Sequence, residues 1–197
     1  MWDGYIGAIN EFIEEHDDVT AQLVIDRFHV AKNYRDAFDT LRKQEMRRLK
    51  RELTDEEYAE VAKGMLWVLR YNHRRLDKKT RKRLRLLFRH SPALHKAYTL
   101  REELTAIFNQ RLSRRQARKR LRRWIEKIKR STVSCYNKFL NTLHKYFDGI
   151  ANYFSDRANS GFVEGFNNKL KVLTRRCFGV KRIDTLARRL RLDAMSY

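Results

Sequence analysis

Cysteine, proline and glycine are scarce in this chain of 197 residues, which holds two, one and seven of them. The two cysteines, Cys135 and Cys177, are far apart, and the six histidines show no metal-binding spacing. This pattern excludes a disulfide framework or an encoded zinc site. Apolar runs are also short, and none approaches the ~20 residues of a membrane-spanning helix. We therefore expect no membrane partner and a location in the reducing cytoplasm.

The lack of proline and glycine leaves long stretches with helical periodicity, so the sequence predicts a mostly α protein. Helices are expected over 30–53, after a capping box at Thr54 to Glu57, and over 135–154. Between 71 and 130, three or four helices should be broken near 76–79, 90–92 and 110–113. Residues 21–26, AQLVID, form the one convincing strand.

Acidic residues are scarce in the middle of the chain. The whole chain has 45 Lys and Arg against 24 Asp and Glu, for a net charge of +21, and residues 70–130 alone contain 23 basic and 4 acidic side chains. Such a concentration favours a polyanion partner, and nucleic acid is a better candidate than a membrane surface.

The densest basic stretch lies just before Trp124 and predicts contacts with a nucleic-acid backbone. Trp124 itself has two readings. It could stack on an unpaired base, or it could pack with the apolar residues one turn away. The candidate backbone contacts are Arg114, Arg115, Arg118 and Arg122.

Residues 161–176, GFVEGFNNKLKVLTRR, predict a helix with one apolar stripe and one polar face. Glu164, Asn168, Lys171 and Arg175 share the polar face, and Asn167 adjoins it. A carboxylate beside amides and cations suits metal-assisted phosphoryl transfer on a nucleic acid, although an ordinary amphipathic surface helix has the same pattern.

Three segments together resemble the DDE-type transposases of bacterial insertion sequences, in the ISL3 family. They are DRFHV at 26–30, VEGFNN at 163–168 with Lys169 and Lys171, and RRCFGV at 175–180. The likeness extends over essentially the whole chain. It implies an RNase H-like α/β core that is only partial here, with one strand kept, the first strands missing, and a large helical insertion. The implied divisions are a partial core at 1–53, a basic helical insertion at 54–155, and C-terminal core helices at 156–197.

By position, Asp26 matches the family's second catalytic acid and Glu164 its third. The resemblance implies that both hold Mg²⁺ or Mn²⁺ in a two-metal site that cleaves and joins DNA. The implied partners are insertion-sequence ends and target DNA, and a homodimer is expected for a complete protein. His29 could orient a metal-bound water, or it could simply pack at the start of a helix.

The family's first catalytic Asp lies on a strand upstream of the region present here, and Asp3, Asp17 and Asp18 do not replace it. We therefore expect this chain to be poorly stable and inactive in transposition. Two other readings stay open. The chain could be a non-catalytic basic helical protein that binds DNA or RNA, or a relic without a selected function.

Overall fold

The computed structural model describes residues 3–16, 22–158, 161–177, 179 and 182–195, and within these it leaves undescribed the side chains of 3–5, 162–164 and 194–195. Throughout this described part, the regular secondary structure is helical, which confirms the mostly α prediction. The α-helices are α1 (Asp3–Glu15), α2 (Arg27–Glu52), α3 (Asp55–Ala62), α4 (Met65–Val68), α5 (Lys78–His90), α6 (Pro92–Asn109), α7 (Arg114–Lys129), α8 (Asn137–Lys145), α9 (Phe147–Asp156), α10 (Gly161–Arg176) and α11 (Ile183–Met195), and two short 3₁₀ helices are η1 (His73–Arg75) and η2 (Ser134–Tyr136). No helix of this described part is long and apolar enough to cross a membrane.

Side chains that cap helices set most of the boundaries, and the sequence encodes them locally. The capping box at Thr54 and Glu57 is present and begins α3 as predicted. A second capping box, from Ser113 and Gln116, begins α7. The Ser91 hydroxyl accepts from the Leu94 amide at 3.2 Å, with Pro92 in the first helical position. The breaks predicted near 76–79, 90–92 and 110–113 are therefore confirmed.

The predicted strand at 21–26 is wrong for residues 22–26, which are irregular, and Ala21 lies outside the described residues. The segment binds a helix instead of a sheet. The Ile25 amide donates to the Gly149 carbonyl at 2.9 Å, and the Asn152 side-chain amide donates to the Leu23 carbonyl at 2.9 Å. A strand needs a paired neighbour, and the hydrogen bonds of this segment go to α9, which is a helix.

The predicted helix over 135–154 is divided in the structure. It begins as η2 and α8, and α9 follows after a break at Tyr146, whose backbone departs from helical values. Because α8 packs on α2 while α9 packs on α7, the break allows one amphipathic stretch to cover two different helices. Periodicity within the stretch gives no sign of this change in partner.

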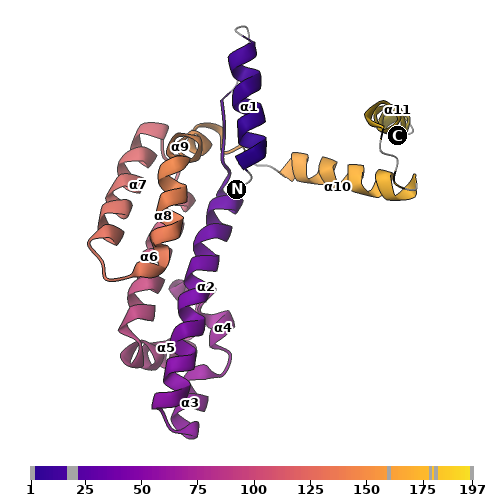
Figure 1. Cartoon of the computed structure of the whole chain (residues 1–197). Coiled ribbons are helices and arrows are strands. Elements are labelled where there is room, and N and C mark those ends of the chain that lie inside the picture. Colours follow the sequence, from indigo (N-terminus) through magenta and orange to yellow (C-terminus); the bar gives the residue numbers. More distant parts are fainter. Residues whose placement is uncertain (1–2, 17–21, 159–160, 178, 180–181, 196–197) are drawn as a thin grey trace. The chain divides into compact units, whose positions relative to one another are not determined.

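The chain divides into two compact units, residues 1–157 and 158–197. In the first unit, α2 lies beside α6 and α8, and α7 packs on α6 and α9 (Figure 1). One continuous apolar core joins these helices, and its largest fully buried side chains include Tyr136, Phe108 and Met65. Burial of these apolar side chains supplies the main favourable contribution to the folding free energy of this unit.

The second unit consists of α10 and α11. The α10 bounds, Gly161–Arg176, are those that the sequence predicts. Leu173 is buried between the two helices, and Lys169 forms an ion pair with Asp193 of α11 at 2.6 Å. The described part of this unit has few other buried groups, since Phe166, Val172, Ile183 and Leu192 are all exposed.

Candidate functional site

Asp26 is the residue that ends the irregular segment and begins α2. Its side-chain oxygen Oδ1 accepts from the His29 amide at 3.0 Å, so the carboxylate acts as the N-cap of the helix. The residue is buried, with 6% of its surface exposed. A carboxylate at a helix N-terminus is favourable in its own right, because the helix dipole and the orphan amides stabilise negative charge.

The segment before Asp26 is held against the first turn of α9. Gly149 permits this contact, since a Cβ atom there would lie 3.3 Å from the Ile25 side chain. The residue before it, Asp148, pairs with Arg118 of α7 and lies 3.9 Å from Arg114. The candidate acid and the basic helix α7 are therefore attached to the same turn of α9.

A cavity of about 490 Å³ lies beside this turn, between α1 and the α8–α9 junction. Its lining includes Leu23, Asn152 and Asp148 from the elements just described, together with Asn10 of α1 and His144 of α8. The cavity is open to solvent, and Leu23 in its wall belongs to the segment that leads to Asp26.

The candidate residues of the second unit lie on α10. Asn168, Lys171 and Arg175 are exposed and share one side of the helix, as their spacing predicts, and Asn167 is half-buried. The Glu164 side chain lies outside the described residues. Asp26 belongs to the first unit and Glu164 to the second, so their meeting in one metal site stays a prediction.

The α7 helix presents a cationic face opposite its buried face. Its apolar side is fully packed, whereas Arg115, Lys119, Arg122 and Arg123 are exposed. Among the ion pairs between described residues, Arg115, Lys119 and Arg123 take part in none, and the Arg122 guanidinium lies over the Phe147 ring at 5.5 Å. Uncompensated cations at this density repel one another and favour a polyanion.

Of the two readings of Trp124, its position in the structure agrees with packing and conflicts with stacking on a base. The indole is 3% exposed, and its N–H donates to the Leu100 carbonyl at 2.8 Å. Its ring also contacts Tyr136 and Phe139, with centroids 6.2 and 5.9 Å away. Trp124 is a core residue, because in α7 its position falls on the stripe that faces α6.

His29 donates its backbone amide to Asp26, and its ring meets Phe28 edge-on at 5.8 Å. Its proposed role toward a metal-bound water stays a prediction. No group of three or more His, Cys, Asp or Glu side chains that could hold a metal ion occurs among the described residues.

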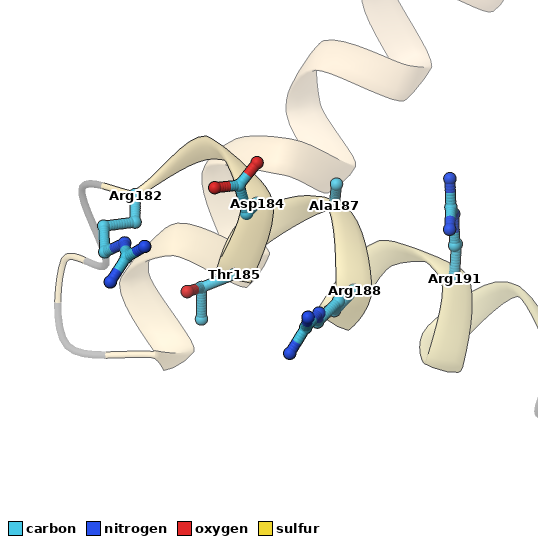
Figure 2. Close-up of a pocket in the computed structure, with 6 residues that line it drawn as sticks. All are labelled: Arg182, Asp184, Thr185, Ala187, Arg188 and Arg191. Carbon is cyan, nitrogen blue, oxygen red and sulfur yellow. The ribbon is translucent and has the colours of Figure 1, made fainter.

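A further basic surface lies along α11 and the residue before it, where Arg182, Arg188 and Arg191 line an open hollow of about 410 Å³ (Figure 2). Figure 2 shows Arg188 and Arg191 on different sides of the helix, with Asp184 near the start. The sequence analysis did not select these arginines, although their spacing along 182–191 is a visible basic pattern.

Comparison with known proteins identifies the family of this chain. The family model described as a transposase, of the DDE type in the ISL3 group, matches residues 1–190. The chain is 32% identical over 163 residues to the transposase for insertion sequence element IS1001 of Bordetella parapertussis, which covers 82% of this chain and 39% of that protein. It is 25% identical over 125 residues to the transposase for insertion sequence element IS1557 of Mycobacterium tuberculosis, covering 64% of this chain and 28% of that protein.

No solved structure matches this chain. Because the family match covers nearly all of the sequence, the assignment does not depend on any single motif. The chain belongs to the ISL3 family of DDE transposases.

Proposed function

We propose that this chain contributes DNA binding and two metal-binding acids to a transposase that cleaves and joins DNA phosphodiesters. The observation that carries the proposal is the attachment of Asp26 and the cationic α7 to the same turn of α9. In the proposed complex, phosphate contacts along α7 would fix the position of the nucleic acid, and the shared attachment to α9 fixes Asp26 relative to that helix.

The donor chemistry of Asp26 fits a hard divalent cation, which prefers carboxylate oxygens. In the proposed site, Asp26 and Glu164 would hold Mg²⁺ or Mn²⁺ together with another acid of the complete protein. Bound metal would supply charge stabilisation and an activated oxygen nucleophile. Asn168, Lys171 and Arg175 would hold DNA phosphates along the exposed face of α10. Within this chain, the helix cap orients the Asp26 carboxylate.

The substitution Asp26→Asn separates the metal role from the capping role. Asn caps helices about as well as Asp, so α2 should keep its N-terminus and the chain its stability. Asn lacks the charge that a divalent cation requires. We expect Mn²⁺ binding, measured by isothermal titration, to weaken at least about tenfold, while the thermal midpoint changes little. Unchanged Mn²⁺ affinity in Asp26→Asn would remove Asp26 from the metal site.

The DNA-binding part is tested by the triple substitution of Arg115, Lys119 and Arg123 to Gln. Each phosphate contact contributes a slope of about 0.9 to the dependence of log K on log salt for duplex DNA. If all three contact phosphates, the slope should fall by about 2.7 in total. The matched control changes Lys32, Arg47 and Lys50, which are exposed on α2, and alters the net charge equally. Equal losses in the two triple variants would show that only overall charge matters.

A second candidate function is nucleic-acid binding without catalysis. The observations that favour it are the exposed cationic face of α7 and the structural role of Asp26 as a helix cap. The two functions differ in their dependence on metal. Under this alternative, Asp26→Asn and Glu164→Gln both leave Mn²⁺ binding and DNA binding unchanged.

A further inference from the structure

The segment from α4 to the start of η1 exposes large aromatic side chains in a basic region. Trp67 is 60% exposed and Tyr71 is 52% exposed, although side chains of this size normally bury most of their surface. The Arg70 guanidinium lies over the Trp67 ring, 5.1 Å from its centroid. We call Trp67, Arg70 and Tyr71 the aromatic platform.

The surroundings of the platform are cationic. Residues 63–75 contain Lys63, Arg70, Arg74 and Arg75 and no acidic residue. All four of these side chains are exposed. The combination of exposed Trp and Tyr with Arg is typical of binding hot spots, and the charge restricts the partner to a polyanion.

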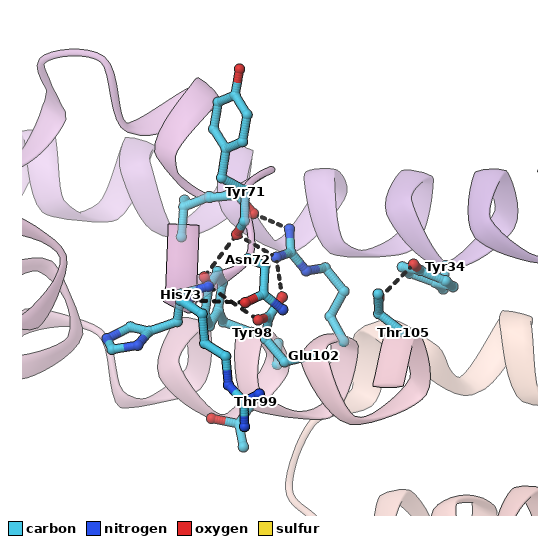
Figure 3. A network of polar contacts seen from close by, with 12 residues as sticks. Tyr34, Tyr71, Asn72, His73, Tyr98, Thr99, Glu102 and Thr105 are labelled. Carbon is cyan, nitrogen blue, oxygen red and sulfur yellow. Dashed lines mark hydrogen bonds and ion pairs between the residues drawn. The ribbon is translucent and has the colours of Figure 1, made fainter. Parts of the chain in front are cut away.

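A network of buried polar contacts holds the backbone of the platform. The Arg101 guanidinium donates to the Leu69 carbonyl and, at 2.8 Å, to the Tyr71 carbonyl, which also accepts from the Tyr98 hydroxyl at 2.8 Å. Burial raises the pKa of Tyr98 to about 12, so this hydroxyl stays a donor at neutral pH. Figure 3 shows the Tyr71 carbonyl pointing into the network while its ring points away from it. The platform is therefore preorganised, which lowers the entropy cost of binding.

An open cavity of about 700 Å³ lies beside the residues that follow the platform in sequence, with Asn72, His73, Arg74 and Arg85 in its wall. Its two acids are already neutralised. Glu102 pairs with Arg101 at 2.6 Å and accepts from the His73 amide, and Glu103 pairs with Lys127. The cavity therefore offers its arginines to an anionic ligand and has the volume expected for a nucleotide.

We propose that the aromatic platform binds the exposed bases of single-stranded DNA, with the adjoining cavity accepting the strand's next nucleotide. Every base has an aromatic face, so stacking on Trp67 and Tyr71 requires no particular sequence. Bases in an intact duplex are stacked on one another and cannot reach the platform. This inference rests on the proposed DNA-binding function. It assigns to the segment from α4 to η1 the base contact that was one of the two readings of Trp124.

The test compares a single-stranded oligonucleotide of about 12 nucleotides, within the usual site size, with a duplex of the same length. Fluorescence anisotropy with the full chain gives both affinities. For Trp67→Ala and for Tyr71→Ala, we expect single-strand affinity to fall about tenfold, as loss of one stacked base predicts, and duplex affinity to change less than about twofold. Trp67→Phe retains an aromatic face and should restore most of the single-strand affinity. Phe12→Ala, an exposed aromatic change on α1, is the matched control and should leave both affinities unchanged.

Three results would overturn the proposal. The first is an equal loss on single strand and duplex, and the second is no loss in either alanine variant. The third is an oligomer in solution that Trp67→Ala dissociates without changing single-strand affinity, which would assign the platform to a second copy of the chain. The Arg115, Lys119 and Arg123 variant distinguishes the two proposals. If it loses duplex affinity while Trp67→Ala has no effect, only the platform inference fails.

Discussion

The substitution Trp124→Phe tests the position of the only tryptophan that the sequence analysis selected. The indole is buried, and its N–H donates to the Leu100 carbonyl at 2.8 Å. Phe keeps an aromatic ring between α7 and α6, but it removes this donor and leaves a small void beside Tyr136. Leu100 lies inside α6, so its carbonyl keeps a helical acceptor role and is not left unsatisfied.

The lost hydrogen bond and the void together should reduce the free energy of unfolding by about 1–3 kcal/mol. The matched variant is Trp67→Phe, which makes the same chemical change at a side chain that is 60% exposed. An exposed change of this kind should alter stability by no more than about 0.5 kcal/mol. Urea denaturation followed by circular dichroism measures both variants under one set of conditions.

The affinity for single-stranded DNA should not follow the loss of stability. We expect Trp124→Phe to leave this affinity unchanged in conditions where the chain is fully folded. Two results would refute the reasoning. One is equal stability of the two variants, and the other is a folded Trp124→Phe protein that has lost single-strand affinity.

Two further predictions concern contacts of α2 and α9. Gly149→Val should destabilise the chain by about 1–3 kcal/mol, because the added methyl groups collide with Ile25, whereas Gly7→Val meets open space and shows only the cost of helix propensity; urea midpoints of the two variants measure the difference. The Arg48 guanidinium and then the Ser91 hydroxyl hold the pKa of Glu45 below its ordinary value of 4.5 against the opposing effect of burial. The stabilisation from this carboxylate is therefore complete above that value and is lost as the pH falls through the lower folded-state pKa, so thermal melts between about pH 6 and about pH 3 should show a smaller acid-induced decrease for Glu45→Gln than for the unchanged chain. An equal decrease in both proteins would contradict the assignment.

Much of the helical organisation follows from local sequence. The Thr54 and Glu57 capping box, the Ser113 cap and Pro92 are short-range signals, and they act through the first unsatisfied amides of a helix. The bounds of α10 and the exposure of Asn168, Lys171 and Arg175 also follow from periodicity in one segment. The family could be identified from the motifs around Asp26 and Glu164, because those motifs are contiguous in sequence.

Other features depend on which element lies across from a segment. AQLVID has strand composition, yet residues 22–26 meet the first turn of α9 and have no paired strand there. The stretch 135–154 is divided, and α9 packs on α7 as well as on α2, whereas α8 packs on α2. Neither partner is visible in the segment's own periodicity.

The sequence by itself determined the charge of the middle region, the helical content and the positions of the two candidate acids. Those properties are set by composition, by spacing and by local hydrogen bonds. Only the tertiary structure decided that Trp124 is buried and Trp67 is exposed, although both lie in basic, apolar-rich segments. The burial of a side chain is fixed by the helix that packs against it, as α6 does for Trp124, and that is a property of the assembled core.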